Sequence, residues 1–145
     1  MTPPAPKIAV SLYLHGRELE PEKITALLAT SPTHQHSMGK KQTAVSGNVL
    51  TRKGGLWAIE PRCNSVSVND HVESLIEMTD SLRRTLRNKQ LSLGNLPGVE
   101  DAYLDIFFIQ KKDKASQREH RFDLSAVSVQ KMAEFGVPIT FTIGF

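Results

Sequence analysis

This sequence has a single cysteine, no long apolar run and no N-terminal segment that resembles a secretory leader. Cys63 is the only cysteine in 145 residues, so no internal disulfide can form and a reducing compartment is favoured. No stretch approaches the roughly 20 apolar residues that a membrane-spanning helix needs. The first seven residues carry three prolines and no apolar core of the kind found in a secretory signal. We therefore expect a cytoplasmic protein that has no membrane partner.

The sequence also lacks a concentrated block of charge. Its formal net charge of +3 and isoelectric point of about 9.1 invite a nucleic-acid partner. Nucleic-acid interfaces, however, gather basic residues on one face among aromatic ones, and here the bases are spread over separate segments. They include Lys40, Lys41, Arg52, Lys53, Arg83, Arg84, Arg87, Lys89, Lys111 and Lys112. We expect most of them to be solvated, and we expect no nucleic-acid partner.

What is present at the N-terminal end is a strand followed by a short helix. Over Ile8–Leu14, strongly apolar residues alternate with smaller or more polar ones, which predicts a strand with one buried face. Pro21 suits the first turn of a helix, where its missing N–H costs nothing. The apolar stripe that follows must face a core, and the helix should end before Ser31–Pro32.

The middle of the chain predicts a polar loop, two strands and one long helix. Residues 33–55 are rich in glycine and polar side chains, with a short strand over Val49–Thr51 before a Gly54–Gly55 turn. Leu56–Ile59 is predicted as a strand. From Asp70 to Gln90, apolar residues recur at helical spacing, and Asp70 with Glu73 fits a capping pattern. We expect one continuous helix here.

The charges of this long helix follow the helix dipole. Acids come first and bases last, the order that the dipole favours, and Asp80 lies four residues before Arg84 as a surface pair. We interpret Arg83, Arg84 and Arg87 as solubilising surface charge at the end of the helix rather than as a phosphate site.

The C-terminal third predicts a central strand, a charged loop, a helix and a final strand. Tyr103–Ile109 is apolar on both faces except at Asp105, which is typical of a strand covered on both sides. A loop at Lys111–Gln117 and a short edge strand at Arg118–Phe122 follow. Ser125 can cap a helix that reaches Phe135 and ends at Gly136. Residues 137–145 alternate as a last strand with one buried face.

These elements predict an α+β fold with a single, mainly antiparallel sheet, two short helices and one long helix. Residues 1–7 form an extended lead-in, and residues 8–145 form one domain. Each end of the chain has an outer strand beside a short capped helix, so two similar halves could flank the long helix as a pseudo-repeat.

Three histidines raise the question of a metal site. His34 and His36 lie two apart, so in a strand both imidazoles point to one side and could bind zinc. His71 lies among carboxylates at the start of the long helix, where it could serve as a third ligand or a general base. No further residues with ligand spacing and no nucleophile turn accompany them. We expect solvated loop histidines, a structural His71, no metal and no cofactor.

The other reactive or unusual residues are interpreted structurally. Cys63 has no catalytic signature around it, so we expect a bystander thiol. Asp105 in an apolar strand needs exposure or a partner such as Arg62 or Arg121. The glycine pairs lack the residues of a phosphate loop and are interpreted as turns. Trp57 could either cover the core or anchor a partner.

A set of short motifs follows in order along most of the chain. They are Pro21-Glu22-x-Ile24-Thr25-x-Leu27-Leu28, Pro32-Thr33, Gly39, Gly55-x-Trp57, His71-Val72-Glu73-Ser74-Leu75, Leu124-Ser125 and Ala133-Glu134-Phe135-Gly136. Their order and spacing resemble the uncharacterised bacterial family called domain of unknown function 4279. The resemblance implies a compact α+β domain of a bacterial cytoplasm and transfers no catalytic residue. Small solitary bacterial proteins of this kind often include immunity proteins, which bind and block a cognate toxin.

The leading hypothesis is therefore a non-enzymatic binding protein, specifically an immunity protein that binds and neutralises a cognate toxin. A partner surface is expected on the 33–53 loop and the charged end of the long helix. Its residues are His34, His36, Lys40, Lys41, Arg52, Lys53, Trp57, Arg84 and Arg87. The alternatives are a metal-dependent enzyme or binder that uses His34, His36 and His71, and a nucleic-acid-binding module that uses the bases of the long helix.

Overall fold

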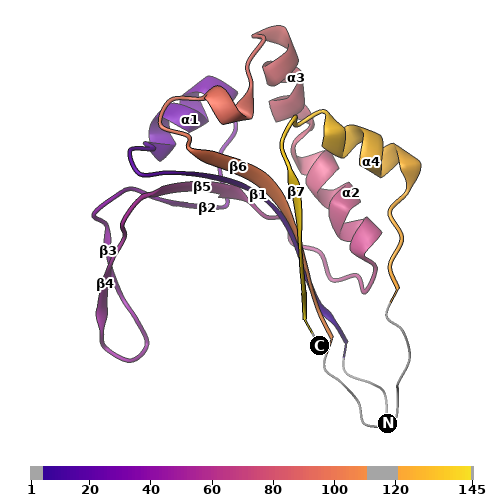
Figure 1. Cartoon of the computed structure of the whole chain (residues 1–145), viewed down its shortest axis with the longest axis horizontal. Coiled ribbons are helices and arrows are strands. Elements are labelled where there is room, and N and C mark those ends of the chain that lie inside the picture. The colour runs from indigo at the N-terminus through magenta and orange to yellow at the C-terminus, as the bar shows by residue number, and fades with distance from the viewer. Residues whose placement is uncertain (1–4, 111–120, 145) are drawn as a thin grey trace.

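The computed structural model describes residues 5–110 and 121–144, which form one five-stranded sheet backed by helices on a single face (Figure 1). The strands are β1 Lys7–Gly16, β2 His34–His36, β3 Lys41–Thr43, β4 Val49–Thr51, β5 Gly55–Ile59, β6 Asp101–Ile109 and β7 Ile139–Gly144. The helices are α1 Pro21–Leu28, α2 Val68–Met78, α3 Asp80–Asn88, α4 Ala126–Ala133 and a 3-10 turn at Leu93–Asn95. None of the helices in these residues is long and apolar enough to cross a bilayer.

The sheet has the order β2-β5-β1-β6-β7, and β3 and β4 form a separate antiparallel ribbon. The pairs β2–β5, β5–β1 and β1–β6 are antiparallel, whereas β6 and β7 are parallel and are connected through α4. The predicted α+β class is confirmed. The strands at the two ends of the chain are not equivalent, because β1 lies in the middle of the sheet and β7 at its edge. The two-half pseudo-repeat is therefore not seen.

The N-terminal strand and helix are confirmed. β1 begins at Lys7, one residue before the predicted domain start, and α1 begins with Pro21 in its first turn. The helix ends at Leu28 because Ala29 adopts a left-handed conformation with φ of 50°. The predicted strands at Val49–Thr51 and Leu56–Ile59 are also present, as β4 and within β5.

The predicted long helix is two helices, and Thr79 is the point of division. Thr79 is completely buried, and its hydroxyl donates to the carbonyl of Leu75 at 2.7 Å and to that of Ile76 at 3.3 Å. A threonine that bonds back to the preceding turn bends a helix. The first of the two helices also starts earlier than predicted, because Ser67, not Asp70, is its N-cap residue.

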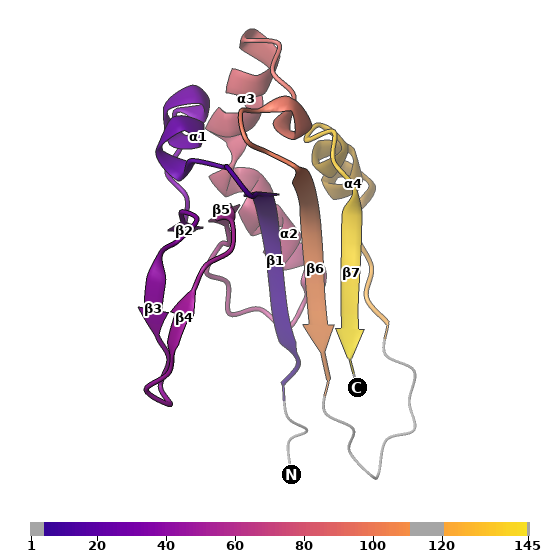
Figure 2. The same cartoon turned by 60° about the vertical axis from the view of Figure 1, so that its left-hand side comes forward.

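The prediction that β6 is covered on both faces is wrong for the face that carries its odd-numbered residues. Burial alternates along the strand: Leu104 and Ile106 are completely buried, whereas Tyr103, Asp105 and Phe107 are half-buried. All four α-helices of the described residues lie on the Leu104 side of the sheet (Figure 2). The other face, which carries the odd-numbered residues of β6, has no helix over it.

The C-terminal helix and strand are confirmed, but the predicted buried face of the last strand is wrong. Ser125 caps α4 by accepting the N–H of Ser128 at 3.1 Å, and Gly136 follows the helix with a φ of 64°. In β7, however, Phe141 is 49% and Ile143 48% exposed, because α4 does not cover this edge of the sheet. The predicted loop at 111–117 and most of the predicted strand at 118–122 lie outside the described residues.

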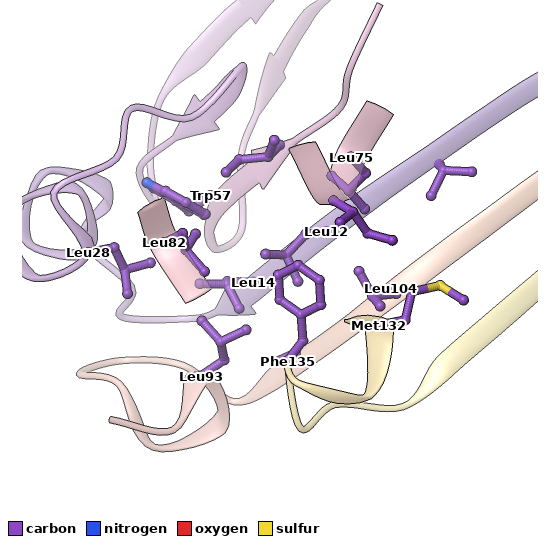
Figure 3. Packing of buried hydrophobic residues seen from close by; sticks show 14 of the residues in the cluster. Leu12, Leu14, Leu28, Trp57, Leu75, Leu82, Leu93, Leu104, Met132 and Phe135 are labelled. Atoms are coloured by element: carbon purple, nitrogen blue, oxygen red, sulfur yellow. The ribbon is translucent and has the colours of Figure 1, made fainter. Parts of the chain in front are cut away.

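The core fills the space between the sheet and its helices (Figure 3). Leu12, Leu14 and Leu104 contribute from the strands, while Leu75 and Leu82 come from α2 and α3. All five side chains are completely buried, so this layer is tightly closed to solvent. Any binding site among these residues therefore lies on the outer surface of the molecule, and the helix-free face is the part of the sheet that no helix covers.

Candidate binding surface

An aromatic and imidazole cluster lies on the helix-free face, formed by Tyr13, His15 and Tyr103. Tyr13 and Tyr103 are direct cross-strand partners on β1 and β6, and their ring centroids are 5.4 Å apart. His15 stacks on Tyr103 at 5.7 Å with an interplanar angle of 12°. The Tyr103 hydroxyl and His15 Nε2 are 3.3 Å apart. We call these three residues the aromatic cluster.

The aromatic cluster is electrically neutral near neutral pH. Burial lowers the pKa of His15, an effect that the nearby Asp101 carboxylate partly opposes. Burial also raises the pKa of Tyr103, as do Tyr13, Asp101 and Asp105. An uncharged surface of tyrosine and neutral histidine can bury area against a partner while keeping polar groups for hydrogen bonds.

A shallow depression of about 340 Å³ adjoins the aromatic cluster at the edge of the sheet. Its lining consists of His15, Gly16, Arg17, His36, Lys53, Gly54, Gly55 and Glu100. Glu100 is held in place by the backbone N–H of Arg17, at 2.8 Å. The imidazole Nδ1 of His36 is buried and has no hydrogen-bond partner among the described residues. The pKa of His36 is lowered by burial and then by Arg52, so this imidazole too is neutral at neutral pH.

Two glycines make this arrangement possible by letting backbones approach closely. A Cβ atom on Gly55 would lie 2.1 Å from the carbonyl oxygen of Leu19, and one on Gly16 would lie 1.7 Å from that of Gly98. Both distances are shorter than any real contact, so only glycine fits. From the sequence, the Gly54–Gly55 pair was interpreted only as a turn, and the close approach of Gly55 to the backbone of Leu19 was not predicted.

A basic ribbon projects beside the depression. We give this name to residues 37–53, which contain β3 and β4 and point away from the helices (Figures 1 and 2). The ribbon carries Lys40, Lys41, Arg52 and Lys53 and no acidic residue. Met38, Val45, Val49 and Leu50 are exposed on it. Exposed apolar side chains among charges of one sign are typical of an interaction surface.

His34 and His36 point to the same side, as predicted, but the metal site they suggested is not assembled. On β2 they are opposite Ala58 and Leu56 of β5, and His34 Nε2 lies 3.3 Å from Glu60 Oε2. His71 is buried on the helix side of the sheet, with Nε2 2.8 Å from the carbonyl oxygen of Ser65. Within the described residues, no group of three His, Cys, Asp or Glu side chains could hold a metal ion.

Trp57 was predicted among the partner-binding residues, and the structure corrects this. Its side chain is completely buried, and Nε1 donates to the hydroxyl of Thr25 at 3.0 Å. A side chain that exposes no surface cannot anchor a partner. Trp57 instead connects the sheet to α1.

The bases of α3 are not part of the basic ribbon, because α3 lies at the opposite end of the molecule (Figures 1 and 2). Arg84 and Arg87 are exposed, and Arg84 pairs with Asp80 at 3.1 Å as predicted. Arg83, interpreted as surface charge, is buried: it pairs with Glu134 at 2.7 Å and donates to the carbonyl of Ile76 at 2.9 Å. It therefore joins α3 to α4.

Asp105 and Cys63 have no catalytic arrangement around them. Asp105 lies half-buried on the helix-free face and accepts a hydrogen bond from the Thr142 hydroxyl at 2.9 Å, so its partner is neither Arg62 nor Arg121. Arg121 pairs with Asp123. Cys63 is a half-buried free thiol.

The aromatic cluster was missed by the sequence interpretation, although part of its signal was visible. The alternation in β1 places Tyr13 and His15 on one face of the strand and Leu12 and Leu14 on the other. The sequence alone could therefore have predicted a polar aromatic pair on the solvent face. That Tyr103 joins this pair depends on the register between β1 and β6, which pairs residues 90 positions apart. Local periodicity does not contain that register.

Comparison with known proteins identifies a family and no activity. A family model described as Domain of unknown function (DUF4279) matches residues 6–145, so the chain belongs to that family. No curated protein and no solved structure matches the chain.

Proposed function

We propose that this member of the DUF4279 family is a non-enzymatic binding protein that engages an acidic protein partner. The contact surface would be the basic ribbon together with the adjoining depression and aromatic cluster. The observation that carries the proposal is the ribbon itself, which has four basic residues, no acid and exposed apolar side chains. We further propose that the partner is a toxin domain, which the protein neutralises by covering its active surface.

Charge and shape support this assignment. A projecting ribbon with bases at Lys40, Lys41, Arg52 and Lys53 attracts an acidic surface and speeds the encounter. The aromatic cluster supplies tyrosines, which are enriched among residues that dominate binding energy. His36 lines the depression between the two, with its Nδ1 buried, so its neutral ring forms part of the floor against which a docked side chain can pack.

The surroundings of the histidines support a non-enzymatic role. The residues that line the depression carry no hydroxyl and no thiol. The hydroxyl beside His15 is the phenol of Tyr103, 3.3 Å from Nε2, and its raised pKa makes it a weak nucleophile. His71 is engaged with the backbone of Ser65 on the other side of the sheet. Nucleophilic catalysis needs a base and a nucleophile within hydrogen-bond reach of each other.

The toxin assignment follows from the kind of small bacterial protein that the family resemblance suggests. Inhibitors of nucleases tend to be acidic because they mimic phosphate, whereas this chain has a net charge of +3. A toxin with an acidic surface, acting on something other than nucleic acid, is therefore the partner that fits the ribbon.

A growth assay tests the proposal. Each neighbouring gene whose product arrests growth is induced in cells that also express the protein as wild type, as Lys40→Gln/Lys41→Gln or as Arg84→Gln/Arg87→Gln. Each double variant removes two positive charges. We expect the wild type and the α3 variant to restore growth and the ribbon variant to fail. Equal protection by all three would contradict a role for the ribbon, and no protection by the wild type would contradict the toxin assignment.

One observation favours a second function, binding of single-stranded nucleic acid. A helix-free sheet face with Tyr13 and Tyr103 beside a basic ribbon resembles a surface on which bases stack. Three acids, Glu100, Asp101 and Asp105, lie near those rings and would repel phosphates, so we rank this function second. Fluorescence anisotropy with labelled 20-nucleotide RNA and DNA tests this second function. Binding that weakens steeply as the salt concentration rises would support it, and no binding at low salt would exclude it.

A further inference from the structure

Among residues 5–110 and 121–144, no strand pairs with the outer edge of β7. The hydrogen bonds from the N–H of Leu104 to the carbonyl of Pro138 (2.9 Å) and from that of Gln110 to the carbonyl of Gly144 (3.1 Å) bracket the β6–β7 ladder. The even-numbered residues of β7 therefore bond to β6. The backbone groups of Ile139, Phe141 and Ile143 face outward, and no described residue bonds to them.

This edge lacks the features that normally prevent edge-to-edge pairing. Exposed edge strands are usually short, charged, bulged or interrupted by proline. β7 has six residues, and the sequence from Val137 to Gly144 contains no charged side chain. Phe141 and Ile143 are each about half exposed on it. The opposite edge strand, β2, has only three residues.

We propose that β7 pairs antiparallel with β7 of a second copy of this chain, with Thr142 on the two-fold axis. The two sheets would then continue into one. This edge is separate from the basic ribbon, which lies beyond the other end of the sheet (Figure 2), whereas the aromatic cluster adjoins it through Tyr103 of β6.

The register follows from matching side chains across the edge. With Thr142 opposite Thr142, Phe141 of each copy lies opposite Ile143 of the other, and directly opposed residues share a face. Phe141 and Ile143 both lie on the helix side of the sheet, because they pair with the buried Ile106 and Phe108. The two apolar pairs would cover each other's exposed area. The threonines would meet on the helix-free face.

The same register satisfies the unpaired backbone groups. The N–H and C=O of Phe141 and Ile143 face outward, so each Phe141–Ile143 pair can exchange two hydrogen bonds between the copies. Thr142 then occupies a non-hydrogen-bonded position, where Cα atoms of opposed residues lie about 4.5 Å apart. A second copy fits this edge because β7 complements itself in length, apolar side chains and absence of repelling charge.

A charge-swap experiment tests the pairing by sedimentation over a range of protein concentrations. Wild type is expected to dimerise as concentration rises. Thr142→Lys and Thr142→Glu place like charges on the axis, so we expect each alone to dimerise at least ten-fold more weakly. An equimolar mixture should recover dimers. Val127→Lys, on exposed α4, is the control that should behave as wild type. The proposal would be overturned if the wild type stays monomeric at every concentration. It would also be overturned if Thr142→Lys and Thr142→Glu each dimerise as strongly as the wild type.

A cross-linking experiment tests the register even if the charged variants fold poorly. In a Cys63→Ser background, Thr142→Cys should form a disulfide-linked dimer under mild oxidation, because the opposed Cα atoms meet the distance that a disulfide needs. Thr140→Cys, on the same face, would place its two sulfurs about 13 Å apart along the strands and should not cross-link. Equal cross-linking at both positions, or at neither, would contradict the register.

Discussion

The two faces of one sheet differ sharply although the same strands build both. On the helix side, Leu12, Leu14 and Leu104 are completely buried. On the helix-free side, Tyr13 and Tyr103, which adjoin these leucines in the chain, are only half-buried. The first face holds the fold together through apolar burial. The second contributes little to that burial, so its aromatic and titratable side chains are available for binding.

The largest effect should come from truncating one residue on each face of β6. Leu104→Ala removes a completely buried side chain and should lower the free energy of unfolding by about 3 kcal/mol. Phe107→Ala, on the half-buried face, should cost less than about 1.5 kcal/mol because its ring already contacts solvent. Urea denaturation of both variants measures the difference. Equal losses would mean that the helix-free face is as much a part of the core as the other.

The next effect concerns two adjacent arginines of α3. Arg83→Ala removes a buried side chain and its bonds to Glu134 and the Ile76 carbonyl, so a loss of about 2 kcal/mol in unfolding free energy is expected. Arg84→Ala breaks only an exposed pair with Asp80 and should cost less than about 0.5 kcal/mol. Thermal denaturation of the two variants compares these losses in stability. A larger loss for Arg84→Ala than for Arg83→Ala would contradict the prediction.

A smaller effect is expected for Tyr103→Phe, which removes one hydroxyl from the aromatic cluster. The contact with His15 Nε2 is long, at 3.3 Å, so stability should fall by no more than about 0.5 kcal/mol. Affinity for the proposed protein partner should fall more than stability does, because the proposed binding surface includes this hydroxyl. Calorimetric titration beside urea denaturation checks this, and a purely structural hydroxyl would lower stability alone.

The smallest effect should be a pH dependence of stability caused by His15. Burial lowers its folded-state pKa below the ordinary 6.5, so the unfolded chain binds the proton more readily. Stability is then complete above pH 6.5 and decreases as pH falls through 6.5 toward the folded-state value. His15→Gln should reduce this dependence and leave the part that His36, whose pKa is also lowered, contributes. Urea midpoints at about pH 7.5 and pH 5.5 compare the two proteins, and an unchanged slope in the variant would remove His15 as the cause.

The elements that the sequence predicted well depend on neighbours in the chain. Pro21 starts α1 and Ser125 caps α4, since both act within one helical turn. The division at Thr79 was missed because helical spacing continues through it, while the bend depends on a buried hydroxyl that bonds to the preceding turn. The sequence analysis did not predict the open face of β6, because both faces of this strand carry apolar residues. Their composition therefore does not reveal which face the helices cover.

The candidate site was harder to predict for the same reason. That His34 and His36 share a side follows from strand geometry alone. The aromatic cluster, in contrast, needs the register between β1 and β6, and the burial of Trp57 needs the packing of α1 on β5. Neither relation is expressed in local sequence, so the residues chosen for partner binding included a core tryptophan and omitted Tyr13 and His15.

The most direct test of the proposed function is the affinity of the isolated protein for the toxin domain that the growth assay identifies, measured by calorimetry. Lys40→Gln/Lys41→Gln is expected to weaken binding at least ten-fold, and this effect should shrink as the salt concentration rises. Arg84→Gln/Arg87→Gln, with the same change in charge, should stay within about two-fold of wild type. If both variants lose affinity equally, or the α3 variant loses more, then the basic ribbon is not the binding surface.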